Sequence, residues 1–300
     1  MNLDPTAIAI AVLLGILSGG VYALMASGLT LIFGVMDIIN IAQGALVILG
    51  AYLSYALSQY LHIDLFVGLL ITMPVMFGLG VFIEWAFIRP LKRDRTRLSI
   101  LVTFGIALLI EGVLGKVFNT NPVSLHAWYV NEPLITVSTS EGPFYVTYMN
   151  VFAFVLAVVL LAGLYILLYR TKFGASLRAT VQDRTAAQLI GVDVERVSAI
   201  TFGIGAALTA AGGMAFGTTM LFQPVSHYDL ISRLLVIIVL GGMGSLGGAL
   251  AAALISLVTY DVTTAVWSST WSSTVFYVLL IVILLVRPQG LFGQLAGRKQ

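Results

Sequence analysis

The sequence predicts an all-α integral membrane protein with about eight transmembrane segments. Apolar residues make up 59% of the 300 residues, charged residues make up 9%, and the mean hydropathy is +1.03. This composition excludes an ordinary soluble protein. Apolar stretches as long as a bilayer requires, about 20 residues, recur along the chain. Glycines interrupt some of them, so we expect broken or re-entrant helices and two halves that resemble inverted repeats.

The whole chain, 1–300, is expected to form one transmembrane domain. Its eight segments lie near 7–34, 41–60, 65–88, 98–118, 150–169, 198–218, 231–261 and 271–287. The first and the seventh exceed the length of one straight span. Because both contain glycines, each is expected to include an extra half-helix.

The basic residues orient these segments. The loop after the third segment is cytoplasmic by the positive-inside rule, since it carries Arg89, Lys92, Arg93, Arg95 and Arg97. The loop 170–197 has five more cations and belongs on the same side. The loop between them, 119–149, has no Lys or Arg and is expected outside. Its stretch 134–148 has the character of a β-hairpin, which either receives a soluble partner or is a passive connector.

The C-terminal cations also favour the cytoplasm. They are Arg287, Arg298 and Lys299. Single crossings of the last three segments would place them outside, so we expect 231–261 to enter and return as two short helices that meet near Gly241 to Ser245.

The polar loop 170–197 has more predicted local structure than a simple tether needs. We expect one short helix from about Gly174 to Val181 and a second from Arg184 to Ile190, with Asp183 as its N-cap and Gly191 as its C-cap. The apolar positions of this hairpin leave room for a polar face; they are Leu177, Val181, Ala186, Leu189 and Ile190, and the polar face is Arg178, Gln182 and Arg184. Such a hairpin is shaped to bind another protein, although a basic tether is the simpler alternative.

Two glycine-containing stretches, 33–51 and 239–253, resemble each other. In both, an apolar helix is expected to be interrupted by glycine and polar residues and to resume at Gly-Ala-Leu. Unwound backbone at membrane depth is tolerated where it lines a cavity or is buried in protein. We therefore predict a solute pathway at Asn40, Gln43, Gly44, Gly241, Gly242, Gly244 and Ser245. The alternative is that the glycines only let helices pack closely.

Ionisable residues inside the segments are few. They are Asp37, Glu84, Glu111, Asp229, Arg233 and Asp261. Such a group costs about 2.5–3.5 kcal/mol near the bilayer centre. We expect Glu84 and Arg233 to lie close enough to a segment end to pair or to reach the interface. A stand-alone channel or ion-coupled carrier would use Asp37, Glu111 or Asp261 as a relay.

Several functions are excluded by what the chain lacks. There is no cysteine, and His62, His126 and His227 lie too far apart in sequence to suggest a metal site. The phosphate-binding pattern Gly-x-x-x-x-Gly-Lys-Ser/Thr is missing, and no catalytic triad can be assembled. We expect no enzyme activity, no cofactor and no nucleic-acid partner, so any ATP hydrolysis that drives transport belongs to another chain.

Several motifs resemble the permease subunit of bacterial branched-chain amino acid ABC transporters, the LivH type. They begin with Gly28-Leu29-Thr30-Leu31-Ile32-Phe33-Gly34, Ile39-Asn40-Ile41-Ala42-Gln43-Gly44 and Gly50-Ala51-Tyr52. The central Gly174-x-x-Leu177-Arg178-Ala179, Gly241-Gly242-Met243-Gly244-Ser245 and Arg287-Pro288-x-Gly290-Leu291-Phe292 complete the match. One departure is Gln43, where many members carry His, and it bears on solute preference.

The resemblance implies a type II ABC importer-like permease in the bacterial cytoplasmic (inner) membrane. Expected partners are two ATP-binding cassette ATPase subunits, a second permease subunit, a periplasmic or extracellular solute-binding protein and membrane lipid. The implied ATPase-coupling residues are Gly174, Leu177, Arg178, Ala179, Arg184 and Gly191. The solute is a branched-chain or other neutral amino acid; relatives with this pattern also carry urea or short amides.

Overall fold

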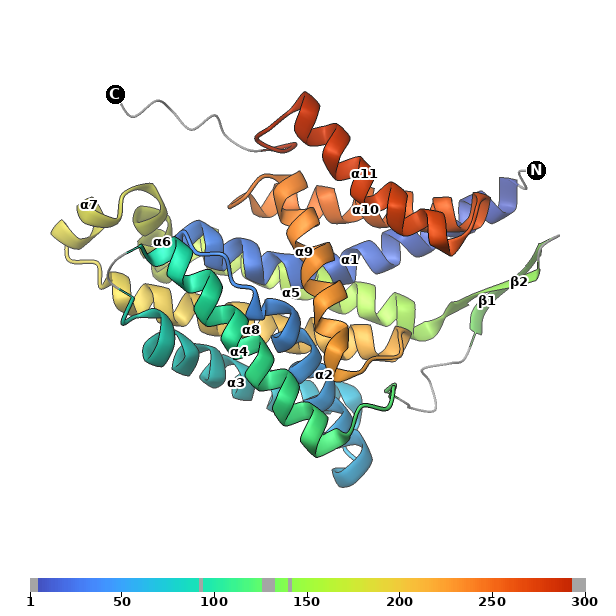
Figure 1. Cartoon of the computed structure of the whole chain (residues 1–300), viewed down its shortest axis with the longest axis horizontal. Helices are drawn as coiled ribbons and strands as arrows, with labels where there is room; N and C mark the ends of the chain where they lie inside the picture. Colours follow the sequence, from blue (N-terminus) through green and yellow to red (C-terminus); the bar gives the residue numbers. More distant parts are fainter. Residues whose placement is uncertain (1–4, 92–93, 126–132, 140–141, 293–300) are drawn as a thin grey trace.

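Long apolar helices dominate the computed structural model, which describes residues 5–91, 94–125, 133–139 and 142–292 (Figure 1). The helices are α1 (Pro5–Met36), α2 (Ala42–Leu61), α3 (Leu65–Ile83), α4 (Arg95–Phe118), α5 (Tyr148–Arg170), α6 (Lys172–Gln182), α7 (Arg184–Leu189), α8 (Val194–Thr219), α9 (His227–Gly241), α10 (Leu246–Val266) and α11 (Ser269–Val286). A π-helical turn, Glu84–Ile88, extends α3, and a 3-10 turn, Pro224–Ser226, precedes α9.

Nine helical stretches within the described residues are long and apolar enough to cross a membrane, one more than expected. The additional one arises because the expected segment 231–261 is divided into α9 and α10, whose junction at 242–245 falls where the glycines predicted it. α10 has 21 residues, so the expectation of two short helices was correct for the 15-residue α9 alone. α9 runs steeply across the direction shared by α1, α5 and α8 (Figure 1).

The expected half-helix inside the first segment was wrong. α1 is continuous over 32 residues, and the chain leaves the helical path only at 37–41. The glycines of α1 instead allow close packing, since a Cβ on Gly15 would lie 2.5 Å from Val258 Cα of α10 and one on Gly28 2.8 Å from the Gly205 carbonyl of α8. Small residues let membrane helices approach each other, and no water competes for the backbone hydrogen bonds of a buried helix. The glycines of α1 therefore do not interrupt the helix.

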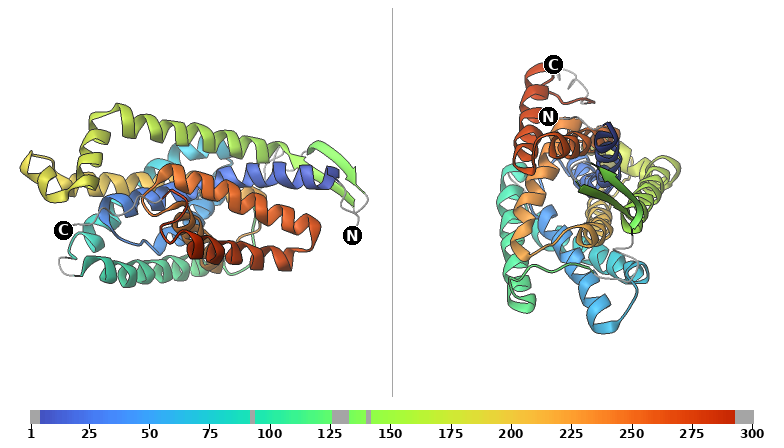
Figure 2. Two further views of the ribbon diagram at one scale, coloured as in Figure 1. Left: turned by 90° about the horizontal axis from the view of Figure 1, so that it is seen from above. Right: turned by 90° about the vertical axis from the view of Figure 1, so that its right-hand side faces the viewer.

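The predicted hairpin is present as strands β1 (Pro133–Thr139) and β2 (Gly142–Thr147). The strands are antiparallel, with Thr139 opposite Gly142 and Ile135 opposite Val146. They lie at one end of the elongated bundle, and α6 and α7 lie at the other (Figure 2). This arrangement agrees with the opposite sides expected for the loops 119–149 and 170–197.

Two helix pairs organise the packing. α1 lies along α10, and α3 lies along α8. α8 also contacts α1 and α2, so α1 and α8 are central to the core. Most of α8 is accordingly buried, whereas α5 and α11 keep most of their surface exposed. Figure 2 shows α4, α9 and α11 together along one side of the bundle.

Candidate functional site

Two buried amides lie at the first break, 37–41: that of Asn40 within it and that of Gln43 at the start of α2. Asn40 Nδ2 donates to Gln43 Oε1 at 3.2 Å, and Gln43 Nε2 donates to the Met25 carbonyl of α1 at 3.4 Å. Asn40 Oδ1 is buried and has no hydrogen-bond partner within the described part of the chain. These amides therefore tie the break to α1, and one acceptor is left for a water or a solute group.

Neighbouring helices satisfy the backbone of this break. On α4, Thr103 Oγ1 accepts from the Ile41 N–H at 3.1 Å, and Thr96 Oγ1 donates to the Asp37 carbonyl at 3.0 Å. On the other side, Gly44 contacts the start of α9, because a Cβ there would lie 2.5 Å from the His227 carbonyl. The start of α2 thus meets α1, α4 and α9.

The second break, 242–245, is a tight turn. Gly242 and Gly244 have φ of 96° and 85°, values that favour glycine over any side chain. Ser245 caps α10, since its Oγ accepts from the Gly248 N–H at 3.1 Å. A Cβ on Gly241 would lie 2.5 Å from the Gly248 carbonyl carbon, so the conformation of the turn and its close packing account for the glycines.

The segment after α11 covers this turn. The Leu291 and Phe292 N–H groups donate to the carbonyls of Leu240 and Gly241 at 2.8 and 3.1 Å. Two carbonyls left unpaired at the end of α9 are thereby satisfied. Gly244 also approaches Gly34, with 3.6 Å between Gly244 Cα and a Cβ built on Gly34. The second break thus lies against the last turn of α1, just before the first break, while Met243 and Gly244 are exposed.

The hairpin α6–α7 is fixed to the end of α5. Gly174 touches the Leu168 carbonyl so closely that a Cβ would clash with it. Arg178 donates from Nη1 to the same carbonyl, and its guanidinium lies 5.3 Å from the centroid of the Tyr169 ring. Arg178, predicted as a contact for another protein, is in this structure bonded to its own chain.

The predicted N-cap of α7 is confirmed, whereas the C-cap is Ile190 and the predicted Gly191 lies one position beyond it. Asp183 Oδ1 accepts from the Thr185 and Ala186 N–H groups at 2.8 and 3.0 Å. Gly191 follows the helix with a φ of 86°, and Arg184, partly buried, lies near enough to Glu84 and Arg95 to interact with their charges.

The predicted apolar face of the hairpin was wrong in part. Leu177 is buried, whereas Val181, Leu189 and Ile190 are 49%, 85% and 76% exposed. α7 has only six residues and lies beyond the end of the bundle, so the described part of the chain does not cover Leu189 and the following Ile190, although Ala187 of the same helix is buried. Ala179, the remaining predicted contact, is partly buried.

A second polar group lies around α9. Its carboxylates and Arg233 were noted as ionisable residues of the segments, but their grouping with His227 was not predicted. His227 Nε2 and Glu111 Oε2 lie 2.9 Å apart. Arg233 Nε lies 2.9 Å from Asp229 Oδ2, and the guanidinium is 4.9 Å from the Tyr260 ring centroid. The sequence analysis considered His227 only as a metal ligand, and it did not predict the pair because Glu111 is 116 positions away. Pairing was correctly expected for Arg233 and for Glu84, whose Oε1 is 3.8 Å from Arg95 Nη2.

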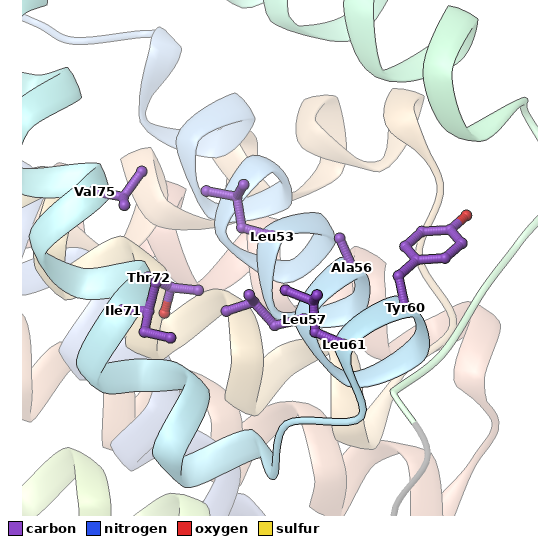
Figure 3. Close-up of a pocket in the computed structure, with 8 residues that line it drawn as sticks. All are labelled: Leu53, Ala56, Leu57, Tyr60, Leu61, Ile71, Thr72 and Val75. Carbon is purple, nitrogen blue, oxygen red and sulfur yellow. The ribbon is translucent and has the colours of Figure 1, made fainter.

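A pocket of about 340 Å³ lies between α2 and α3 (Figure 3). Its lining is nearly all apolar: Leu53, Ala56, Leu57, Tyr60, Leu61, Ile71, Thr72 and Val75. None of the predicted pathway residues lines it. In the part of the chain that the structure describes, no three His, Cys, Asp or Glu residues are grouped as a metal ion requires.

Comparison with known proteins assigns this architecture to a family. The family described as "Branched-chain amino acid transport system / permease component" matches residues 11–284. The high-affinity branched-chain amino acid permease protein LivH of Salmonella typhimurium is 27% identical over 292 residues, which is 93% of this chain and 94% of that protein. BraD of Pseudomonas aeruginosa, with the same description, is 25% identical over 289 residues, or 93% of this chain and 94% of BraD.

A relative with a different solute in its name is also found. The autoinducer 2 import system permease protein LsrC of Escherichia coli is 26% identical over 245 residues, 77% of this chain and 64% of LsrC. No solved structure matches the chain with comparable significance. The family match spans nearly all of the helical bundle; the chain therefore belongs to the branched-chain amino acid transport permease family, as a multi-pass, non-catalytic membrane component of an ABC transport system.

Proposed function

We propose that this chain is the transmembrane permease subunit of an ATP-driven importer for branched-chain or other neutral amino acids, in the bacterial cytoplasmic membrane. The relatives LivH and BraD support amino acids as the solute class. The match to LsrC keeps a second class open, so urea, short amides and other small neutral solutes are the alternative.

The observation that carries the proposal is the exposed apolar tip of the α6–α7 hairpin. Leu189 and Ile190 are exposed at the end of the bundle where Arg89, Arg95 and Arg184 also lie. Because the cations mark an aqueous side, lipid does not cover this tip. An exposed apolar patch in water is typical of a protein interaction site. We assign the tip to an ATP-binding cassette ATPase subunit.

The hairpin is built to transmit a displacement of this tip. Gly174 and Arg178 fix α6 to the end of α5. On the other side, the Val192 N–H donates to the Ala187 carbonyl at 3.0 Å and Asp193 caps α8 through the Arg196 N–H at 3.1 Å. α8 packs against α1, α2 and α3. Closure of two ATPase subunits would therefore move α5 and α8 against the rest of the bundle, as alternating access requires.

We also propose two inverted halves, α1–α4 and α8–α11. The packing of α1 along α10 has its counterpart in the packing of α8 along α3. When the two halves are matched in this way, the break 37–41 follows α1, the first helix of its half. The break 242–245 follows α9, the second helix of the other half. The two breaks then occupy different positions in their halves, contrary to the repeat that their sequences suggested.

The remaining partners follow from the two ends of the bundle. A second permease subunit would lie beside this chain in the membrane, and a solute-binding protein would meet the β1–β2 end. The proposed pathway includes Asn40, Gln43 and Gly44, with the unpartnered Asn40 Oδ1 as a group that a solute can reach after a movement of α2. Gly241, Gly242, Gly244 and Ser245 would act on the pathway through the turn that they form.

Replacing Leu189 with Glu tests the assignment of the tip. We expect the chain to remain in the membrane, but to lose the ATPase subunits on purification and to lose at least about tenfold of its ATP-dependent leucine uptake, because a charge replaces an apolar contact. Leu134→Glu, which puts the same charge at the opposite end of the molecule, should keep the ATPase subunits bound. Normal co-purification of ATPase subunits with Leu189→Glu would contradict the assignment.

A further inference from the structure

Several ionisable side chains of the candidate spans gather around α9. Glu111 of α4 pairs with His227, and Asp229 pairs with Arg233. Asp261 of α10 accepts a hydrogen bond from Ser18 Oγ at 3.2 Å and is attracted by the charge of Arg233. α9 lies about midway between the α6–α7 end and the β1–β2 end of the bundle (Figure 1). The residues of α9 and the groups that interact with them therefore lie within the membrane-spanning part of the chain.

Part of this polar group is on the surface of the chain. The side chain of Asp229 is 60% exposed, Tyr228 is 43% exposed and Ser232 is exposed. α9, which carries these three residues, lies with α4 and α11 along one side of the bundle (Figure 2). A carboxylate that faces lipid at this depth is costly, so such groups usually face a partner or a water-filled path.

The exposed groups are mainly hydrogen-bond acceptors. Asp229 and Glu111, whose side chain is 23% exposed, carry carboxylates, and Tyr228 adds a hydroxyl. The one cation among them, Arg233, is 17% exposed and is held by Asp229 and the Tyr260 ring. His227, whose ring lies 4.0 Å from that of Tyr228, is buried, and its Nδ1 has no partner in the described part of the chain. A surface of this kind attracts a positively charged donor and offers little to an anion.

We propose that the α9 surface, defined by Glu111, Tyr228, Asp229 and Ser232, is a solute-binding site that recognises a protonated primary amine. The inference rests on the proposed import function and makes it more specific. The site would select the ammonium group of an α-amino acid and would give no charge-assisted contact to urea or a short amide. The apolar side of an amino acid would face the apolar residues around this surface.

Binding of L-leucine to the purified full-length chain in nanodiscs tests the site without a binding protein or an ATPase. We expect L-leucine methyl ester, which keeps the amine, to compete with labelled L-leucine. We expect 4-methylpentanoate, which lacks the amine, and urea not to compete. Asp229→Asn and Glu111→Gln should each weaken leucine binding about tenfold or more, since each removes a charge-assisted hydrogen bond.

Asp94→Asn is the matched control, because Asp94 is also an exposed carboxylate and its φ of 48° suits Asn equally well. It should bind leucine as the unchanged chain does. Equal competition by 4-methylpentanoate, unchanged binding by both variants with thermal unfolding like that of the unchanged chain, or no binding of either amine would overturn the site. Leucine uptake by cells that express the complete transporter tests the proposed function separately, so failure of the site and failure of the function are distinguishable.

Discussion

Gly44 illustrates how single residues determine this fold. Its hydrogen atom faces the His227 carbonyl and Ile231 of α9, and this contact brings the start of α2 to the start of α9. The sequence pattern identified Gly44, Asn40 and Gln43 from the glycine and polar step of the first break. It did not identify His227, because a contact between residues far apart in sequence leaves no periodic signal.

Replacing Gly44 with Ala should lower the free energy of unfolding by about 1–3 kcal/mol, since the methyl group meets backbone that cannot move aside. Thermal unfolding of the purified chain in detergent measures the effect. Gly163→Ala is the control, because a Cβ on Gly163 of α5 meets nothing within 4 Å. Equal unfolding temperatures for the two variants would contradict the close contact between α2 and α9.

At the scale of an element, the α6–α7 hairpin was largely predictable. Asp183 and Gly191 indicate the ends of α7 in the sequence, because capping residues are close in sequence to the helix that they cap. The buried and exposed faces were less predictable. A hydrophobic pattern assumes that apolar positions turn toward the chain's own core, and Leu189 and Ile190 are too far from that core to be covered by it.

Arg178 is the residue that joins this hairpin to α5. Arg178→Glu should uncouple ATP hydrolysis from uptake without removing the chain from the membrane, because a carboxylate cannot donate to the Leu168 carbonyl at the end of α5. Arg178→Lys keeps the charge but not the planar group over Tyr169, so we expect intermediate coupling. The measurement is leucine uptake per ATP hydrolysed in proteoliposomes that contain the complete transporter, and normal coupling with Glu would contradict this role.

At the scale of the whole molecule, composition was sufficient to predict a helical membrane protein. The positive-inside rule also separated the loops that the structure places at opposite ends. The sequence predicted the division at 242–245, but it did not predict that the helices on both sides of this turn are long enough to cross a membrane. That turn has positive φ at Gly242 and Gly244, and it accepts hydrogen bonds from the N–H groups of Leu291 and Phe292. These hydrogen bonds join segments that are far apart in sequence, so no local pattern predicts them.

The central claim is that this chain works as the permease of an ATP-driven importer, and its partners test the claim most directly. The measurement is to tag the chain, extract it gently from its native membrane and identify by mass spectrometry the proteins that accompany it. We predict two ATPase subunits and a second permease subunit. An intact, well-folded chain that is recovered alone would contradict the claim and indicate a stand-alone channel or carrier.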